Sequence, residues 1–193
     1  MLPELVVASA NPDKVKEISS VLDGLVTLIP RPDHVPDVVE DGDTLEDNAR
    51  LKAQAILQAT GIAALSDDTG LSVDALGGEP GVRSARYSGE NATYEENVEK
   101  LIQNLAGVPP RLRTARFKTV AMICYPDGSE IIATGVVEGM ISESRKGDEG
   151  FGYDPVFVPY EGDGSSFAEM GEEKHSISHR GRALRNLVEM INS

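Results

Sequence analysis

Residues 65–89 have the sequence LSDDTGLSVDALGGEPGVRSARYSG, and two adjacent carboxylates, Asp67 and Asp68, follow the short apolar run 62–65. Strand-forming residues that lead into acids and a glycine predict a strand that ends at the Asp pair, where open α/β sheets bind their ligands. Neighbouring like charges repel each other, which favours a neutralising partner such as a divalent cation. An acidic pair also fits a solvated loop, so the rest of the chain must decide between the two interpretations.

Upstream, residues 4–9 predict a buried strand that passes through a short polar loop into a helix. Asn11 suits the N-cap of this helix and Pro12 its first position. Such a loop places backbone N–H groups and the positive end of the helix dipole at one point, which favours an anion, and Lys14 adds a cation. An ordinary capped helix with a surface lysine has the same pattern.

Residues 30–43 form a loop rich in proline and acids that includes Glu40. Thr44 then begins a capping-box sequence, and apolar positions at helical spacing predict a helix that ends at Gly61. Lys52 lies at the edge of the apolar face, from which its ammonium either reaches a ligand cleft or is solvated.

The second half of the chain predicts a further helix from Thr93, with Tyr94, Val98, Leu101 and Leu105 on one face. Strand-like runs at 117–125 and 130–141 flank a turn sequence and predict a hairpin. Strand–helix units beside a long hairpin indicate a mixed sheet.

A glycine-flanked aromatic loop follows at residues 150–155, GFGYDP. Glycines allow close approach of a backbone, and the rings of Phe151 and Tyr153 can either stack a base or plug the core. Residues 172–180 concentrate polar chemistry, and the apolar spacing of residues 183–191 predicts a packed helix.

The composition fits a single globular domain, or one domain with two lobes: 193 residues, 40% hydrophobic and 26% charged. No apolar run approaches a membrane span, and residues 1–14 lack the features of a secretory signal. The single cysteine, Cys124, excludes an intramolecular disulfide and predicts a buried thiol in a reducing, cytoplasmic environment. A net charge of −14 argues against non-specific nucleic-acid binding, although it allows a small anion held by local cations or a metal.

Six motifs stand in the order and spacing of one family, and the chain resembles the inosine triphosphate pyrophosphatases, also called XTP/dITP diphosphatases. The motifs run from the first predicted strand to the last helix, and together they are far more specific than each alone. They are residues 9–14 (SANPDK), 44–52 (TLEDNARLK), 66–71 (SDDTGL), 84–89 (SARYSG), 151–154 (FGYD), and Lys174 with 178–181 (SHRG).

The resemblance implies a two-lobed α/β fold over residues 1–193, with a long mixed β-sheet flanked by helices and a cleft between the lobes. It also implies Mg²⁺-dependent hydrolysis of ITP, dITP and XTP to nucleoside monophosphate and pyrophosphate, which cleanses the nucleotide pool. A homodimer is implied as well, with no nucleic-acid or membrane partner.

The resemblance further assigns roles to individual residues. Asp68 would be the catalytic base, and Glu40 and Asp68 would bind the metal. The triphosphate would be held by Ser9, Ala10, Asn11, Pro12, Asp13 and Lys14. Thr69 would also contact substrate, and the base pocket would be formed by Phe151, Gly152, Tyr153, Asp154, Lys174, His179 and Arg180.

The motif at residues 44–49 departs from the family pattern Thr-Phe-x-Glu-Asn-Ala, because Leu45 and Asp47 replace Phe and Glu. Leucine keeps the apolar role, and aspartate keeps a carboxylate that is one methylene shorter. Three other interpretations stay open: a septum-inhibitor-like nucleotide pyrophosphatase, a nucleotide-binding sensor without catalysis, and an acidic structural domain. The aromatic loop and the 178–180 segment argue against the first, and Glu40 with Asp68 argues against the second.

Overall fold

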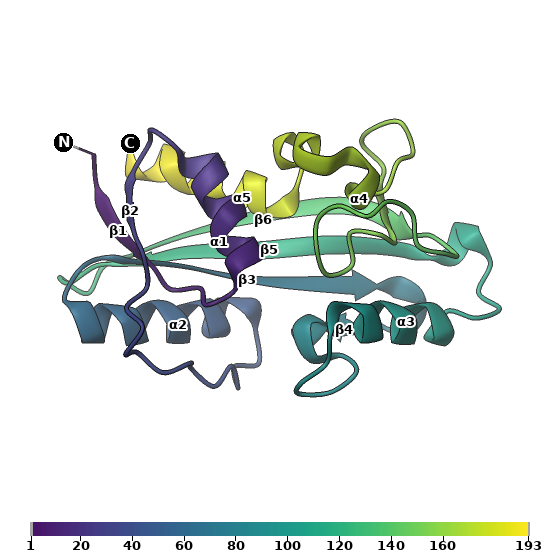
Figure 1. Cartoon of the computed structure of the whole chain (residues 1–193), viewed down its shortest axis with the longest axis horizontal. Helices are drawn as coiled ribbons and strands as arrows, with labels where there is room; N and C mark the ends of the chain where they lie inside the picture. Colours follow the sequence, from purple (N-terminus) through teal and green to yellow (C-terminus); the bar gives the residue numbers. More distant parts are fainter. Residues whose placement is uncertain (1, 193) are drawn as a thin grey trace. The chain divides into compact units, whose positions relative to one another are not determined.

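The computed structural model describes residues 2–192 and has a mixed α/β fold, as the sequence predicts (Figure 1). The strands are β1 (Glu4–Val7), β2 (Thr27–Ile29), β3 (Ala64–Val73), β4 (Pro80–Gly81), β5 (Thr114–Cys124), β6 (Glu130–Ile141) and β7 (Phe157–Pro159). The α-helices are α1 (Pro12–Leu22), α2 (Leu45–Thr60), α3 (Tyr94–Asn104), α4 (Phe167–Met170) and α5 (His179–Ile191). Short 3₁₀ turns occur at Asp74–Leu76, Ser84–Arg86, Pro110–Leu112 and Gly171–Ser176.

All seven strands belong to one sheet with the order β2-β1-β3-β5-β6-β7, and β4 pairs with β3 beside this path. β1 is parallel to β2 and β3, whereas β4 is antiparallel to β3 and β7 is antiparallel to β6. The sheet is therefore mixed, which confirms the fold class predicted from the sequence.

The chain divides into two compact units, in agreement with the predicted two-lobed organisation. The first unit comprises the described residues of Met1–Asp68, Thr119–Gly135 and His179–Ser193, and the second comprises Thr69–Lys118 and Val136–Ser178. Each unit contains its own buried apolar core, and the two are described separately below. The cleft expected between lobes stays a prediction.

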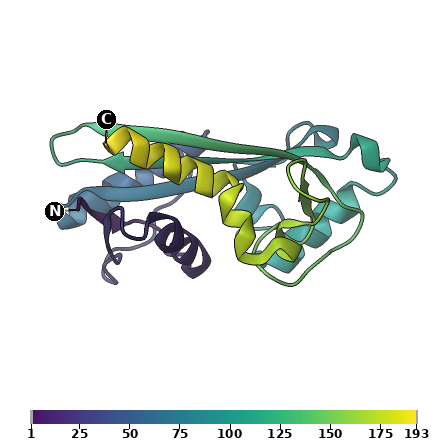
Figure 2. The same cartoon turned by 90° about the horizontal axis from the view of Figure 1, so that it is seen from above.

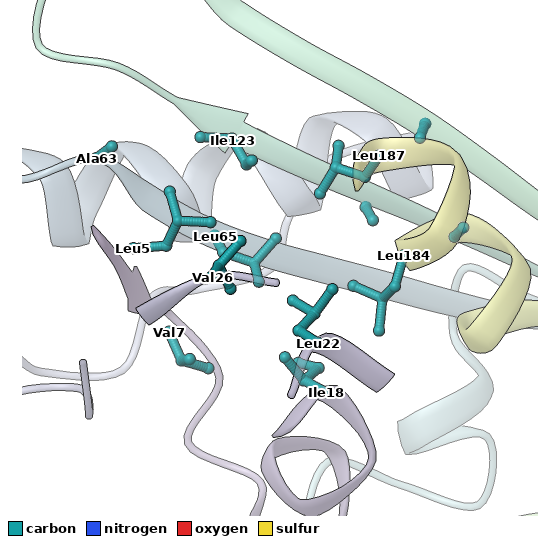
Figure 3. Packing of buried hydrophobic residues seen from close by; sticks show 13 residues of the cluster. Leu5, Val7, Ile18, Leu22, Val26, Ala63, Leu65, Ile123, Leu184 and Leu187 are labelled. Atoms are coloured by element: carbon teal, nitrogen blue, oxygen red, sulfur yellow. The ribbon is translucent and has the colours of Figure 1, made fainter. Parts of the chain in front are cut away.

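In the first unit, successive strand residues face two different apolar layers. Leu5, Val7 and Leu65 pack against α1 and α5, and Figure 3 shows these side chains converging with those of the two helices. Val6 and Ala64, one residue away, pack instead against α2. This is the two-residue period of a strand that is buried on both faces. In Figure 1, α2 and the pair α1 and α5 accordingly lie on opposite faces of these strands, and Figure 2 shows α5 beside β6.

The core of the second unit combines α3, α4 and the ends of the long strands. Three phenylalanine rings, Phe117, Phe157 and Phe167, lie within 4.7–6.3 Å of one another, centroid to centroid. Aromatic clusters of this kind bury a large apolar area per residue, which lets a small unit keep a dense core.

The strand that contains the acidic pair differs from its prediction. It was expected to end at Asp67 and Asp68, but β3 continues through both residues to Val73. The pair does not end the strand because both carboxylates are buried and each meets cations from a neighbouring helix, as described below. A carboxylate that has a counter-charge inside the protein can stay within a buried strand and does not need contact with solvent.

The starts of α1, α2 and α3 are predicted well, because capping depends on local residues, whereas α5 begins at His179, before the predicted apolar spacing of residues 183–191. Asn11 caps α1 through its side chain and Thr44 caps α2. The full reciprocal capping box occurs in α3, between Thr93 and Glu96. In α2 the shorter Asp47 side chain instead accepts a hydrogen bond from the hydroxyl of Thr44, at 2.6 Å.

The burial of two further residues, Tyr94 and Cys124, can be compared with the sequence analysis. Tyr94 was expected on one face of α3 with Val98, Leu101 and Leu105; those three are buried, whereas 37% of Tyr94 is exposed. Cys124 is buried as expected, and burial raises the pKa of its thiol to about 11. None of the helices in the described part of the chain is long and apolar enough to cross a membrane.

Candidate active site

The loop between β1 and α1 carries the residues predicted to hold a triphosphate. The side chain of Asn11 accepts hydrogen bonds from the backbone N–H groups of Asp13 and Lys14, at 2.9 and 3.4 Å. The Ser9 hydroxyl in turn accepts from the N–H of Asn11, at 3.2 Å. Ala10 and Pro12 complete this ordered turn at the positive end of the α1 dipole, which favours an anion there.

Asp67 and Asp68 project to opposite faces of β3, because consecutive strand residues alternate. Asp67 meets cations from α1 and α5, whereas Asp68 meets groups from α2. The repulsion predicted between the two carboxylates is therefore relieved by two separate sets of partners. This alternation divides the polar residues of the first unit into two groups.

The group on the α2 side centres on Lys52. Its ammonium lies 3.1 Å from Asp68 Oδ1 and 2.9 Å from Glu40 Oε1. Asn48 donates to the other oxygen of Asp68, at 3.3 Å, and accepts from the backbone N–H of Gly42, at 2.9 Å. Asn48 thereby connects the acidic loop to Asp68, the carboxylate that the resemblance assigns as the base.

The surroundings of Asp68 make its carboxyl easier to protonate than an ordinary aspartate. Burial raises the pKa of Asp68 above its ordinary value, and the nearby ammonium of Lys52 opposes the shift only in part. Burial also disfavours the charge on Lys52, but Asp68, Asp67 and Glu40 outweigh it, so the pKa of Lys52 is raised and the ammonium stays charged. A carboxylate with a raised pKa is suited to accepting a proton.

Glu40 and Asp68 are the donor set available for a metal on this face. Both carboxylates reach the same ammonium, so their oxygens converge on one point. Within residues 2–192 no cluster of three or more His, Cys, Asp or Glu side chains could hold an ion by itself. Mg²⁺ in nucleotide-processing sites is typically bound by one or two carboxylates together with substrate phosphates and water, so two convergent carboxylates fit such an ion.

The group on the α1 and α5 side centres on Arg180, which is 3% exposed. Its Nε donates to Asp67 Oδ2 at 3.0 Å, and its Nη1 forms a short ion pair with Glu17. Lys14 Nζ lies 3.5 Å from the same oxygen of Asp67. Lys14, expected as a mobile surface cation or a phosphate ligand, is thus tethered to the buried strand.

The pKa directions in this group follow from burial and charge together. Burial would raise the pKa of Asp67, but Lys14 and Arg180 outweigh it, and the pKa lies far below its ordinary value. Burial lowers the pKa of Lys14, although Asp67 opposes this. The pKa of Arg180 is raised because its two carboxylates outweigh its burial. Asp67 is therefore a permanent anion, in contrast to Asp68.

His179 begins α5, immediately before Arg180, and is also buried. Its Nδ1 lies 2.7 Å from the hydroxyl of Thr119 on β5, which fixes the plane of the ring. His179 and Arg180, two of the residues predicted to form the base pocket, are therefore held by their neighbours before any ligand arrives.

The second unit contains the remaining residues predicted to bind substrate. Lys174 Nζ lies 2.6 Å from Asp154 Oδ2, and both side chains are 7% exposed. The same oxygen accepts from the backbone N–H of Phe151, at 3.0 Å, and Lys174 Nζ lies 5.3 Å from the centroid of the Phe151 ring. Aromatic loop and lysine thus form one cluster, as the resemblance implies.

Glycine and tyrosine shape the same loop. Gly150 has a φ of 75°, and a Cβ there would overlap the carboxylate of Asp154, which explains the close approach expected from the glycines. Gly152 has a φ of 62°. Tyr153 is a core residue whose hydroxyl donates to the carbonyl of Ser84, at 2.9 Å, so the core-plug interpretation holds for this ring. Thr69 is half-buried on β3, next to Asp68 in the chain.

Sequence reasoning overlooked two buried polar residues, Glu17 and Asn48. Both lie at helical spacing within apolar stripes, one residue before Ile18 and Ala49 respectively. A polar residue in the buried register of an amphipathic helix requires a partner, and this pattern is visible in the sequence. The partners, Arg180 and Asp68, are distant along the chain, so the sequence pattern does not identify them.

Comparison with known proteins identifies the family of this chain. The model of the Ham1 family matches residues 5–190. A dITP/XTP pyrophosphatase of Geobacter sulfurreducens is 48% identical over 194 residues, which cover 98% of this chain and 97% of the relative. A dITP/XTP pyrophosphatase of Caldanaerobacter subterraneus is 46% identical over 193 residues, with 97% and 95% covered.

Solved structures give the same result. A HAM1 protein from Coxiella burnetii superimposes with a TM-score of 0.88 at 38% identity, covering 99% of both chains. The Ham1 protein of Staphylococcus aureus gives a TM-score of 0.86 at 37% identity, covering 98% of both. The chain belongs to the Ham1 family, and the resemblance inferred from its six motifs is confirmed.

Proposed function

We propose that this protein hydrolyses the deaminated purine nucleoside triphosphates dITP, ITP and XTP between the α and β phosphates. The products are the nucleoside monophosphate and pyrophosphate. The observation that carries the proposal is the group formed by Asp68, Lys52 and Glu40, which combines a proton acceptor, a cation and a second carboxylate. The names of the curated relatives at 46–48% identity support the substrate class.

The proposed reaction is in-line attack of water on the α phosphorus. A bond forms from the water oxygen to phosphorus, the bond from phosphorus to the bridging oxygen breaks, and pyrophosphate leaves with that oxygen. Asp68 orients the water and accepts its proton, a role that its raised pKa favours. Positioning and charge neutralisation carry most of the catalysis in such reactions.

The charge of the triphosphate must be offset in a chain with a net charge of −14. Lys14 and Lys52 supply two cations, and the ordered turn at residues 9–13 supplies the positive end of a helix dipole. Glu40 and Asp68 would hold Mg²⁺, which would supply Lewis-acid neutralisation of the phosphate charge. Thr69, adjacent to Asp68, is proposed to contact the substrate beside the reacting phosphate.

Base recognition is assigned to the aromatic loop, Lys174, His179 and Arg180. Hypoxanthine and xanthine present an acceptor oxygen at position 6, whereas adenine presents an amino donor. A buried donor at this position pairs with the oxygen and is left unsatisfied by adenine, which makes rejection strong. Pyrophosphate release from ITP should therefore greatly exceed release from ATP, and equal rates would contradict this assignment.

Asp68→Asn tests the proposed base. We expect turnover of dITP to fall by about 10²–10⁴, the usual contribution of a general base, while the circular dichroism spectrum is unchanged. Asp163→Asn, which alters a carboxylate in an exposed loop, should retain activity. Near-full activity of Asp68→Asn would refute the role of this residue.

Chelation by EDTA should abolish wild-type turnover, and added Mg²⁺ should restore it. A wild-type protein that binds dITP but releases no pyrophosphate under any of these conditions would be a sensor, and the proposed function would fail. The proposal also retains a cytoplasmic homodimer, for which light scattering should give twice the mass of the 193-residue chain.

A further inference from the structure

Tyr94 contacts the ring that is proposed to stack the purine. The centroids of Tyr94 and Phe151 lie 5.7 Å apart, and the ring planes are inclined by 42°. This tilted arrangement is one that aromatic pairs prefer. Tyr94 is nevertheless 37% exposed, although it shares its spacing along α3 with Val98 and Leu101, which are buried. The packing of α3 against the core therefore explains the position of only part of the Tyr94 side chain.

Tyr94 projects from a rigid position. It is the first residue of α3, and the capping box fixes the backbone on both sides of it. The hydroxyl of Thr93 accepts from the N–H of Glu96 at 3.2 Å, and the carboxylate of Glu96 accepts from the N–H of Thr93 at 2.8 Å. Beyond it, Val98 and Leu101 anchor the helix in the core of the second unit.

Phe151, by contrast, lies in a loop between two glycines. Gly150 and Gly152 on either side have φ values of 75° and 62°. Asp154 holds the backbone N–H of Phe151, at 3.0 Å, but this hydrogen bond does not determine the rotation of the ring about χ1 and χ2. The ring itself has the ammonium of Lys174 at 5.3 Å and Tyr94 beside it.

We propose that Tyr94 is a positioning residue that holds the Phe151 ring in the orientation required to stack the purine base. This inference rests on the proposed function, because it assumes that Phe151 contacts the base. A ring held from a capped helix loses little freedom on binding, whereas a ring on a glycine-flanked loop would have to be ordered by the ligand. Tyr94 therefore contributes to affinity for the base and not to the reaction at phosphorus.

Kinetics of Tyr94→Leu and Tyr94→Phe test this role. Leucine keeps an apolar side chain on the helix but removes the aromatic pair, so we expect the KM for dITP to rise about 2- to 10-fold with kcat unchanged. Phenylalanine keeps the ring and should restore the wild-type KM. Tyr160→Ala, which removes an exposed tyrosine elsewhere in the second unit, is the matched control and should leave both constants unchanged.

Inhibition by inorganic tripolyphosphate separates base binding from phosphate binding, because this probe has no base. We expect its inhibition constant to be the same in wild type and Tyr94→Leu. Equal KM values for wild type and Tyr94→Leu would overturn the inference. A parallel rise in the KM for dITP and in the inhibition constant would also overturn it, since that result indicates a general disturbance.

The proposed function and this inference fail in different ways. Absence of dITP hydrolysis in the wild type removes the proposed function. An active wild type whose KM does not respond to Tyr94→Leu leaves the function intact and removes only the role of Tyr94.

Discussion

Arg180 is held in the first unit by two buried carboxylates, Asp67 and Glu17, and each of the three depends on the others. A buried ion pair adds little net stability over an apolar replacement, but removal of one partner leaves a charge without compensation. Arg180→Met should therefore lower the free energy of unfolding by about 3–5 kcal/mol in urea denaturation. A loss comparable to that of a surface ion pair would show that Asp67 and Glu17 find other partners.

A matched control is Arg116→Met in the second unit. Arg116 also pairs with two carboxylates, Asp74 and Glu138, but is 40% exposed, and its loss should cost at most about 1 kcal/mol. The pH dependence distinguishes the two variants further. Because the folded pKa of Asp67 lies below its ordinary value of 3.8, its contribution is present above that value and is lost as the pH falls through the folded pKa. The deficit of Arg180→Met should accordingly shrink below pH 3.8.

The residues of the candidate site were predictable where a local signal marked them. Asn11 and Lys14 follow a strand and begin a helix, and Phe151 lies between glycines. Glu17 and Asn48 were not predicted, because the reason for their burial is a partner more than a dozen residues away. The role of Tyr94 was missed for the same reason.

At the scale of elements, a glycine on β6, Gly135, allows α5 to pack closely against this strand. A Cβ at Gly135 would overlap the backbone carbonyl oxygen of His179, so the absence of a side chain lets the start of α5 rest directly on the strand. Asn186 reinforces this contact by donating to the carbonyl of Thr134, at 3.0 Å. The positions of His179 and Arg180 thus depend on the absence of a side chain at Gly135.

Gly135→Ala should displace α5 and with it both residues. We expect a loss of about 1–3 kcal/mol in the free energy of unfolding, as for other overpacked positions, together with reduced turnover of dITP. Thr134→Ala, on the adjacent exposed residue, is the control and should change neither quantity. Wild-type stability of Gly135→Ala would mean that the strand and the helix separate easily.

Element types and order were predictable because periodicity and capping are local, and β6 begins and ends at the predicted residues. Strand ends were less predictable. β3 continues past the acidic pair, where its end was predicted. A strand continues through a charged residue when the tertiary structure supplies a counter-charge, and a single sequence contains that information only indirectly.

At the scale of the whole molecule, 32 acidic residues outnumber 18 basic residues, so the folded chain repels itself. The free energy of unfolding at pH 7 should therefore rise between about 0.01 and 0.15 M NaCl, as the Debye length falls from about 30 to about 8 Å. Near the isoelectric point the same titration should show no rise. A fall at pH 7 would indicate that attractive surface pairs outweigh the net repulsion.

The family and the fold class of the whole chain were predictable because six motifs occur in fixed order, and motif order survives substitution elsewhere. Length and composition allow one domain with two lobes, but only the resemblance favoured this division over a single domain. Composition and periodicity do not contain it, since β3, β5 and β6 each contribute residues to both units.

The alternation of Asp67 and Asp68 restricts how the gene for this protein can change length. Loss or gain of a single codon between Ala64 and Asp67 would move each of the two acids to the opposite face of β3. The cations that now pair with these acids would then lack their partners. Changes of two codons would preserve sidedness. Lineages of this enzyme should therefore vary in length at their loops, while this short segment keeps its parity.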